Sequence, residues 1–208
     1  MTTYDVRMNY EQAVNGFIRL VTSLNGTHWS RPALGVWTVR DLVGHTSRAL
    51  LTVESYLDPT STTDDPSLPD AVAYFRAAPA GTLADPQAVA KRGRQAGAAL
   101  GDRPAAAVAT IAERVLALVD GVDDDALVRT PINTMTLIGY LPTRTFELVV
   151  HSLDLAAATN VELPAELARV IPACLVLAAQ LAGERDDAAM VLLALTGRRP
   201  LPDGFSVV

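Results

Sequence analysis

One stretch of the sequence, TRTFELVVHSLDLAAAT at residues 143–159, combines the composition of an apolar helix with four ionisable side chains. Arg144, Glu147, His151 and Asp154 follow one another at steps of three and four residues. Side chains at these spacings lie on one face of an α-helix. The segment therefore predicts a helix with a polar seam, which either faces water or builds a functional site.

The chemistry that this seam suggests is metal binding. Glu147 and His151 lie one helical turn apart and can converge on one ion, and helical bundles build metal sites from side chains on facing helices. His45, in a second predicted helix, is the third candidate ligand. Two imidazoles and one carboxylate with an open fourth position are typical of catalytic zinc. The spacing alone leaves two other interpretations open, a surface Glu–His pair and a hydrogen-bonded core histidine.

The neighbouring polar residues have alternative roles. Arg144 and Asp154 either orient the ligands from behind or form salt bridges on the helix surface. Asp41, one turn before His45, is predicted to cap its helix and not to bind metal. His28 lies in a loop and is predicted to be exposed.

Apolar residues recur with a helical period along most of the chain, which predicts that helices carry these side chains. The predicted long helices cover residues 8–24, 39–57, 104–121, 142–159, 164–182 and 185–195. Thr38 with Asp41 predicts a capped helix start, and Pro142 is predicted to lie in a first turn. Residues 122–134 form a polar connection with room for a short extended piece. The fold class is therefore all-α, a four-helix bundle with extra C-terminal helices.

Composition sets further limits. The chain of 208 residues carries 23 acidic and 17 basic side chains, a formal charge of −6, which argues against nucleic acid as its main partner. Cys174 is the single cysteine, so no internal disulfide forms, and its apolar surroundings predict a buried, inert thiol. The N-terminus lacks the pattern of a signal peptide, and no uninterrupted apolar run is long enough to span a membrane. We expect a cytoplasmic protein without a membrane partner.

Two motif segments and one segment near the C-terminus resemble a known family. WSRPALGVWTVRDLVGHTSRAL at residues 29–50 resembles the N-terminal signature of the mycothiol-dependent maleylpyruvate isomerase family. RTFELVVHSLDLAAAT at residues 144–159 resembles its second signature, and LLALTGRRPLP at residues 192–202 resembles a family ending. The resemblance runs from about residue 10 to 160. It implies the DinB-like fold, a four-helix bundle that binds a divalent metal.

The resemblance also implies roles for individual residues. His45 matches the first metal ligand of the family, and Glu147 and His151 match the second and third. The implied cofactors are a divalent metal, with zinc expected from the ligand types, and mycothiol as the thiol cosubstrate. We expect residues 1–160 to form the metal-binding bundle and residues 161–208 a helical extension packed on it, too short for the separate C-terminal domain of the isomerase.

The functional hypothesis is a metal-dependent thiol S-transferase or isomerase. A thiol that coordinates the cation loses its proton, and the thiolate attacks a small electrophile. One alternative is a bundle that binds metal or a small ligand without catalysis. Another is a metal-dependent hydrolase, in which Asp154 or Asp41 would have to serve as the base. The chain is expected to be a monomer or a homodimer.

Overall fold

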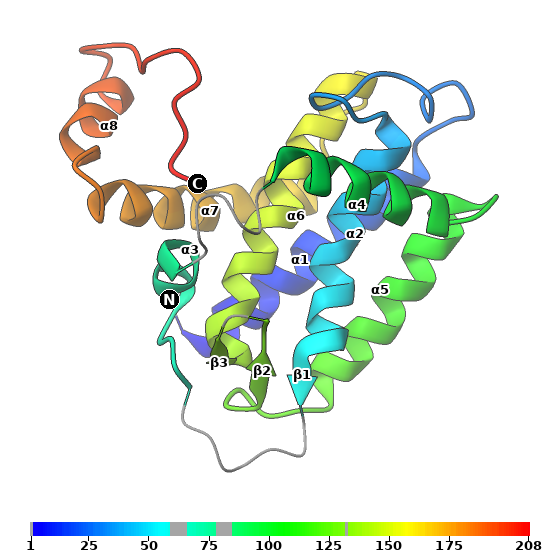
Figure 1. Cartoon of the computed structure of the whole chain (residues 1–208), viewed down its shortest axis with the longest axis horizontal. Helices are drawn as coiled ribbons and strands as arrows, with labels where there is room; N and C mark the ends of the chain where they lie inside the picture. The colour runs from blue at the N-terminus through cyan, green and yellow to red at the C-terminus, as the bar shows by residue number, and fades with distance from the viewer. Residues whose placement is uncertain (1, 59–65, 78–84, 132) are drawn as a thin grey trace.

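The computed structural model of the chain describes residues 2–58, 66–77, 85–131 and 133–208. This part contains eight helices and three short strands. The helices are α1 (Thr3–Thr22), α2 (Val39–Tyr56), α3 (Ala71–Ala77), α4 (Pro86–Ala99), α5 (Pro104–Asp120), α6 (Leu137–Thr159), α7 (Ala165–Gly183) and α8 (Ala188–Leu195), and the strands are β1 (Leu57–Asp58), β2 (Leu127–Arg129) and β3 (Thr134–Thr136). The prediction of an all-α bundle is confirmed (Figure 1).

Capping explains where the key helices begin. The predicted capping box of α2 is present: Thr38 Oγ1 accepts the Asp41 N–H, and the Asp41 carboxylate accepts the Thr38 N–H. The predicted start of α6 at Pro142 is wrong. The helix begins five residues earlier, because Thr136 caps it by accepting the Gly139 N–H. Pro142 therefore lies inside α6, where its missing N–H leaves one helical hydrogen bond unmade.

A small antiparallel sheet in the order β1–β2–β3 holds the two site-bearing helices together at one end. Leu57 pairs with Val128, and Val128 pairs with Met135 on its other side. Because β1 directly follows α2 and β3 directly precedes α6, the sheet fixes the end of one helix against the start of the other. The short extended piece expected in residues 122–134 is thus the central strand, β2, of a three-stranded sheet that the sequence pattern did not reveal.

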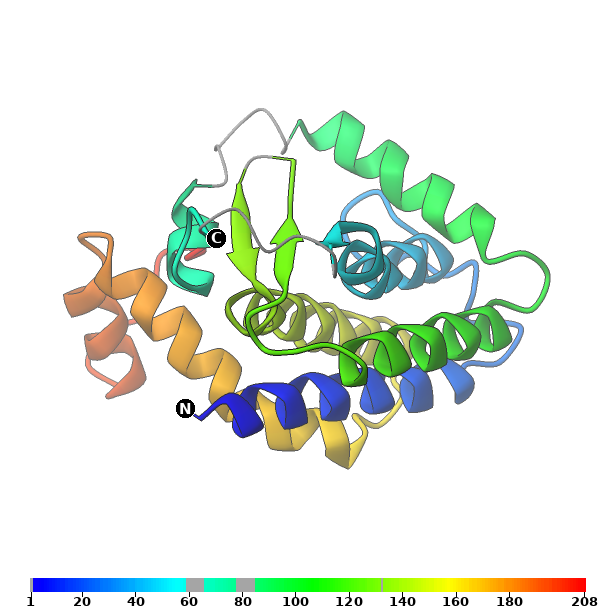
Figure 2. The ribbon, with the colours of Figure 1, turned by 90° about the horizontal axis from the view of Figure 1, so that it is seen from below.

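The bundle places α6 at its centre. Figure 2 shows α6 between α1 and α2, with α5 beside α1, and the helix contacts agree with this arrangement. The fully buried side chains at these contacts are large and apolar, among them Tyr10, Phe17, Leu42, Leu50 and Leu148. Their burial supplies the main driving force for folding. It also sets the rotation of α2 and α6 about their axes, and so fixes which residues face each other.

Helix α4 crosses α2 at unusually short range (Figure 1). A Cβ atom added to Gly44 on α2 would lie 2.1 Å from the backbone nitrogen of Gly97 on α4. A Cβ atom added to Gly93 would lie 2.5 Å from the indole ring of Trp37. Glycine at these positions is what lets the two helices pack backbone to backbone and lets Trp37 lie between them.

The C-terminal helices lie at the edge of the bundle. Helix α7 packs on α1 and α6, and α8 packs on α7. Residues 161–208 thus include one helix that shares the main core and one that does not. By length and composition alone α7 could cross a membrane, a property that core helices of soluble proteins also have.

Replacing Gly44 by alanine is expected to destabilise the fold. The added methyl group must push α4 away from α2, and overpacking of this kind costs about 1–3 kcal/mol. The measurement is the free energy of unfolding in urea. Gly183→Ala is the matched control, because Gly183 is also helical but nothing lies within 4 Å of its added Cβ atom. Equal unfolding free energies for the two variants would contradict the close α2–α4 contact.

Candidate metal centre

Three side chains from two facing helices converge at one place. His45 comes from α2, and Glu147 and His151 come from α6. One potential ligand atom from each lies within 4.8 Å of the others. The two imidazole rings are 5.0 Å apart between centroids and nearly perpendicular. The structure thus brings together the three residues that the sequence proposes as ligands.

The geometry of this cluster suits a divalent cation. His151 Nε2 and Glu147 Oε2 are 3.2 Å apart, and two ligands of one tetrahedral zinc, with bonds of about 2.1 Å, are separated by roughly 3.4 Å. His45 Nδ1 is buried and has no hydrogen-bond partner among the described residues. An unpaired buried nitrogen costs free energy that a bound cation would recover. The side chains of His151 and Glu147 keep 15% and 30% of their surface exposed, so the cluster remains open to solvent on one side.

Asp154 holds His151 from behind. Its Oδ2 atom lies 3.2 Å from His151 Nδ1 and accepts the hydrogen bond from that nitrogen. The other ring nitrogen, Nε2, therefore faces Glu147. A carboxylate in this position orients a metal-binding imidazole and increases its basicity. Of the two roles open for Asp154, the geometry favours the orienting one.

Arg144 occupies a different environment. Its guanidinium carbon lies 4.9 Å from the ring centroid of Tyr140 and 5.5 Å from that of Tyr74. Its Nε–H donates to Thr143 Oγ1 at 2.9 Å. The described part of the chain offers it no salt bridge, so the surface ion pair considered for Arg144 is absent there. Its charge acts on the centre through space, because it stabilises the ionised form of Glu147.

The electrostatics of the cluster assign a charge to each group. Burial and the nearby His151 lower the pKa of His45 to about 4. Burial opposes ionisation of Glu147, but the hydrogen bond from His151 and the charge of Arg144 outweigh it and lower the pKa of Glu147 to about 2. Burial likewise opposes protonation of His151, but its hydrogen bonds to Asp154 and Glu147 raise its pKa to about 9. At neutral pH Glu147 is therefore anionic, His45 neutral and His151 cationic.

Trp37 is a neighbour of the centre to which the sequence analysis gave no role. Its ring lies 4.4 Å from the His45 ring, and its Nε1–H donates to the Ala90 carbonyl on α4 at 3.1 Å. Trp37 therefore connects α4 to the candidate ligand on α2. The available signal was its position, directly before the Thr38 cap and eight residues before His45.

The other candidate residues lie outside the cluster. Asp41 caps α2, as predicted. His28 was predicted to be exposed and this is wrong: it is 9% exposed, because its Nδ1 accepts the Asn25 N–H in a tight turn. Cys174 is buried as predicted, and burial raises the pKa of its thiol to about 12, which keeps it protonated and unreactive.

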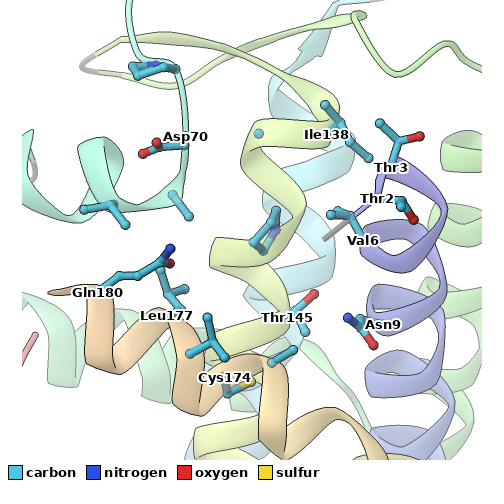
Figure 3. Close-up of a pocket in the computed structure, with 17 residues that line it drawn as sticks. Thr2, Thr3, Val6, Asn9, Asp70, Ile138, Thr145, Cys174, Leu177 and Gln180 are labelled. Atoms are coloured by element: carbon cyan, nitrogen blue, oxygen red, sulfur yellow. The ribbon is translucent and has the colours of Figure 1, made fainter. Parts of the chain in front are cut away.

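A pocket of about 580 Å³ lies elsewhere, between the start of α1, the start of α6, residues 69–72 and α7 (Figure 3). Thr145 and Cys174 point into it, and none of the three clustered residues lines it. Pro142 and Thr145 face this pocket, whereas Glu147 lies five residues beyond Pro142, which is roughly 140° around the helix axis. Helix α6 thus presents the pocket and the candidate metal centre on opposite faces.

Comparison with known proteins identifies a family. The sequence model of the family described as "Mycothiol maleylpyruvate isomerase N-terminal domain" matches residues 10–156. No curated protein and no solved structure matches the chain. The match covers more than two thirds of the sequence, including residues 29–50 and most of residues 144–159, so the predicted family is confirmed. Residues 192–202, which resemble a family ending, lie outside the match. The family match suggests a mycothiol-related, metal-binding DinB-like domain.

Zinc binding is expected to release a proton from His151. A metal-binding imidazole must be unprotonated, and His151, with a pKa of about 9, is protonated at neutral pH. Zinc affinity should therefore rise about tenfold per pH unit from neutral pH and level off above the pKa of His151. Calorimetry in buffers of different ionisation enthalpy counts the released protons.

The variant Asp154→Asn tests the origin of the raised pKa of His151. Loss of the carboxylate lowers the pKa of His151, so fewer protons should be released just below pH 9. His28→Ala, which changes a histidine far from the cluster in sequence and outside it in the structure, should behave like the parent. Affinity that does not vary between neutral pH and pH 9 would contradict the charge assigned to His151.

Proposed function

Because the chain belongs to the mycothiol maleylpyruvate isomerase N-terminal domain family, we propose that it is a divalent-metal-dependent thiol S-transferase or isomerase. It uses a low-molecular-weight thiol and acts on a small electrophile. The family description indicates that this thiol is mycothiol. The single observation that carries the proposal is the convergence of His45, Glu147 and His151 from facing helices. We also propose that residues 1–160 form the metal-binding bundle and residues 161–208 a helical extension packed on it.

The proposed ligands are the three clustered residues, and their types favour zinc among common divalent cations. These residues would hold the cation, and a bound cation would supply the stabilisation that turns a coordinating thiol into a nucleophilic thiolate. The buried, unpaired His45 Nδ1 supports this assignment, because the chain itself offers that nitrogen no partner among the described residues.

The chain's own residues would prepare the site in three ways. Asp154 fixes the orientation of His151, so that its Nε2 faces the centre. The charge of Arg144 adds to the hydrogen bond from His151 in keeping Glu147 ionised in spite of burial. Trp37 covers one side of the His45 ring. The thiol and the electrophile would then approach from the solvent-exposed side, near Glu147.

The thiol must come from outside the chain. Cys174 is the only cysteine, and its burial and raised pKa make it a poor nucleophile. It lines the pocket on the opposite face of α6 and not the clustered site.

Hydrolysis is less well supported by the same geometry. It needs a carboxylate free to act as a base on water. Asp154 is bound to His151, and Asp41 is bound to Thr38 in the helix cap. Both carboxylates that the sequence offered for this role therefore already have a structural partner.

The proposal is tested with cobalt-substituted protein. Adding a small thiol such as 2-mercaptoethanol, and then mycothiol, is expected to produce a sulfur-to-metal charge-transfer band. Cys174→Ala should give the same band, because the external thiol is its source, and His151→Ala should abolish it. Turnover is then measured as thiol-dependent consumption of a panel of electrophiles.

The outcomes separate the candidate functions. A band together with turnover supports the enzyme. A band without turnover across the panel would favour a non-catalytic metal-binding bundle, and a spectrum that thiols do not change would overturn the thiol-dependent function.

A further inference from the structure

The C-terminal helices expose an apolar surface that the bundle does not use. All eight residues of α8 are apolar, yet none of them is buried. Leu192 and Leu195 are 63% and 71% exposed. Helices this short are marginal in water and depend on packing of an apolar face. Something other than α7 must therefore cover α8 if it is stable.

The exposed side chains form helical seams. On α8, Ala188, Leu192 and Leu195 recur at steps of four and three, and all three are exposed. That spacing is typical of a helix face that packs on another helix. On α7, Leu175 and Val176 are 59% and 60% exposed, and Val176 also lines the pocket beside α1 and α6. We call the exposed faces of α7 and α8 the C-terminal apolar surface.

The charges beside α8 indicate what covers this surface. Asp186 and Asp187 directly precede the helix, and Arg198 and Arg199 follow it within four residues. Asp187 already forms an ion pair with Arg185 at 3.0 Å, so Asp186 is the acidic group left for a partner at this end. Two copies of α8 packed antiparallel would place the acidic end of each beside the basic end of the other. An interface with a twofold axis requires this kind of self-complementarity.

We propose that the C-terminal apolar surface is the interface of a homodimer, in which the α8 helices of two chains pack antiparallel around a twofold axis. Helix α8 is only about 12 Å long, so the exposed face of α7 must contribute to reach the roughly 800 Å² per partner of a stable interface. Figures 1 and 2 show α8 at the outer end of the molecule, beyond α7, where a second copy can approach.

A lipid surface is the competing occupant, and the charges argue against it. Helices that lie on membranes carry Lys and Arg on their polar faces. Here acidic residues flank one end of α8, and the whole chain has a formal charge of −6. Anionic lipid would repel the acidic end of α8, whereas an antiparallel second copy would place its Arg198 and Arg199 beside that end.

The first test is the mass of the full chain in solution by light scattering, over a range of micromolar concentrations. Twice the chain mass of 22.1 kDa is expected for the parent. Leu192→Glu with Leu195→Glu should give the monomer, with unchanged helix content by circular dichroism. The matched control is Val36→Glu, which changes a residue that is 75% exposed in a distant loop and should leave the dimer intact.

The second test uses the charges and leaves the apolar seam unchanged. Asp186→Arg with Asp187→Arg, and separately Arg198→Asp with Arg199→Asp, should each weaken self-association by at least tenfold. Mixing the two variants should restore a dimer, because each end of one chain then meets an opposite charge on the other.

Three results would overturn the proposal. They are a parent that stays monomeric throughout, a dimer that survives the two glutamates, and a monomer that binds vesicles of anionic lipid through α8. A mixture of the charge variants that remains monomeric would overturn the antiparallel arrangement.

Discussion

The candidate site depends on one packing contact, the face-to-face placement of α2 and α6. His45 lies on one helix and Glu147 and His151 on the other, so no local segment can form the cluster alone. The apolar residues between the two helices set their rotation, and the β1–β2–β3 sheet holds the end of α2 to the start of α6. Because ligand atoms must meet within a few tenths of an ångström, a small rotation of either helix would separate the three side chains.

The polar residues around the cluster favour cation binding, but burying them lowers the stability of the fold. Burial destabilises each charged group, and the chain compensates through Asp154 behind His151 and Arg144 near Glu147. His45 Nδ1 receives no such compensation within the described chain. Buried polar atoms without a partner are rare in folded proteins and often mark a functional site. The same residues therefore destabilise the fold and give the strongest indication of its function.

Periodicity and capping explain how much of this the sequence could predict. The all-α fold, the Thr38 capping box and the shared face of Glu147 and His151 follow from local patterns, and all three are present. Spacing along one helix cannot show that His45 faces them; the sequence pattern offered His45 only as a candidate ligand, and the resemblance to the family strengthened that expectation.

Local capping and turn contacts, together with one long-range helix contact, account for the sequence predictions that were wrong or missing. The Thr136 cap at the end of β3 moved the start of α6 ahead of Pro142. The turn at Asn25 buried His28. The approach of Gly44 to Gly97 brought α4 and Trp37 to the site. Each of these depends on residues that are brought together only by the tertiary fold or by turn chemistry.

The most direct test of the central claim, that His45, Glu147 and His151 hold one cation, is the metal content of purified protein by mass spectrometry. The parent and His28→Ala are expected to carry about one zinc per chain, and His45→Ala almost none while keeping its helix content. Equal metal in the parent and His45→Ala, or no metal in the parent after incubation with zinc, would contradict the account and leave Glu147 and His151 as a hydrogen-bonded pair within the bundle.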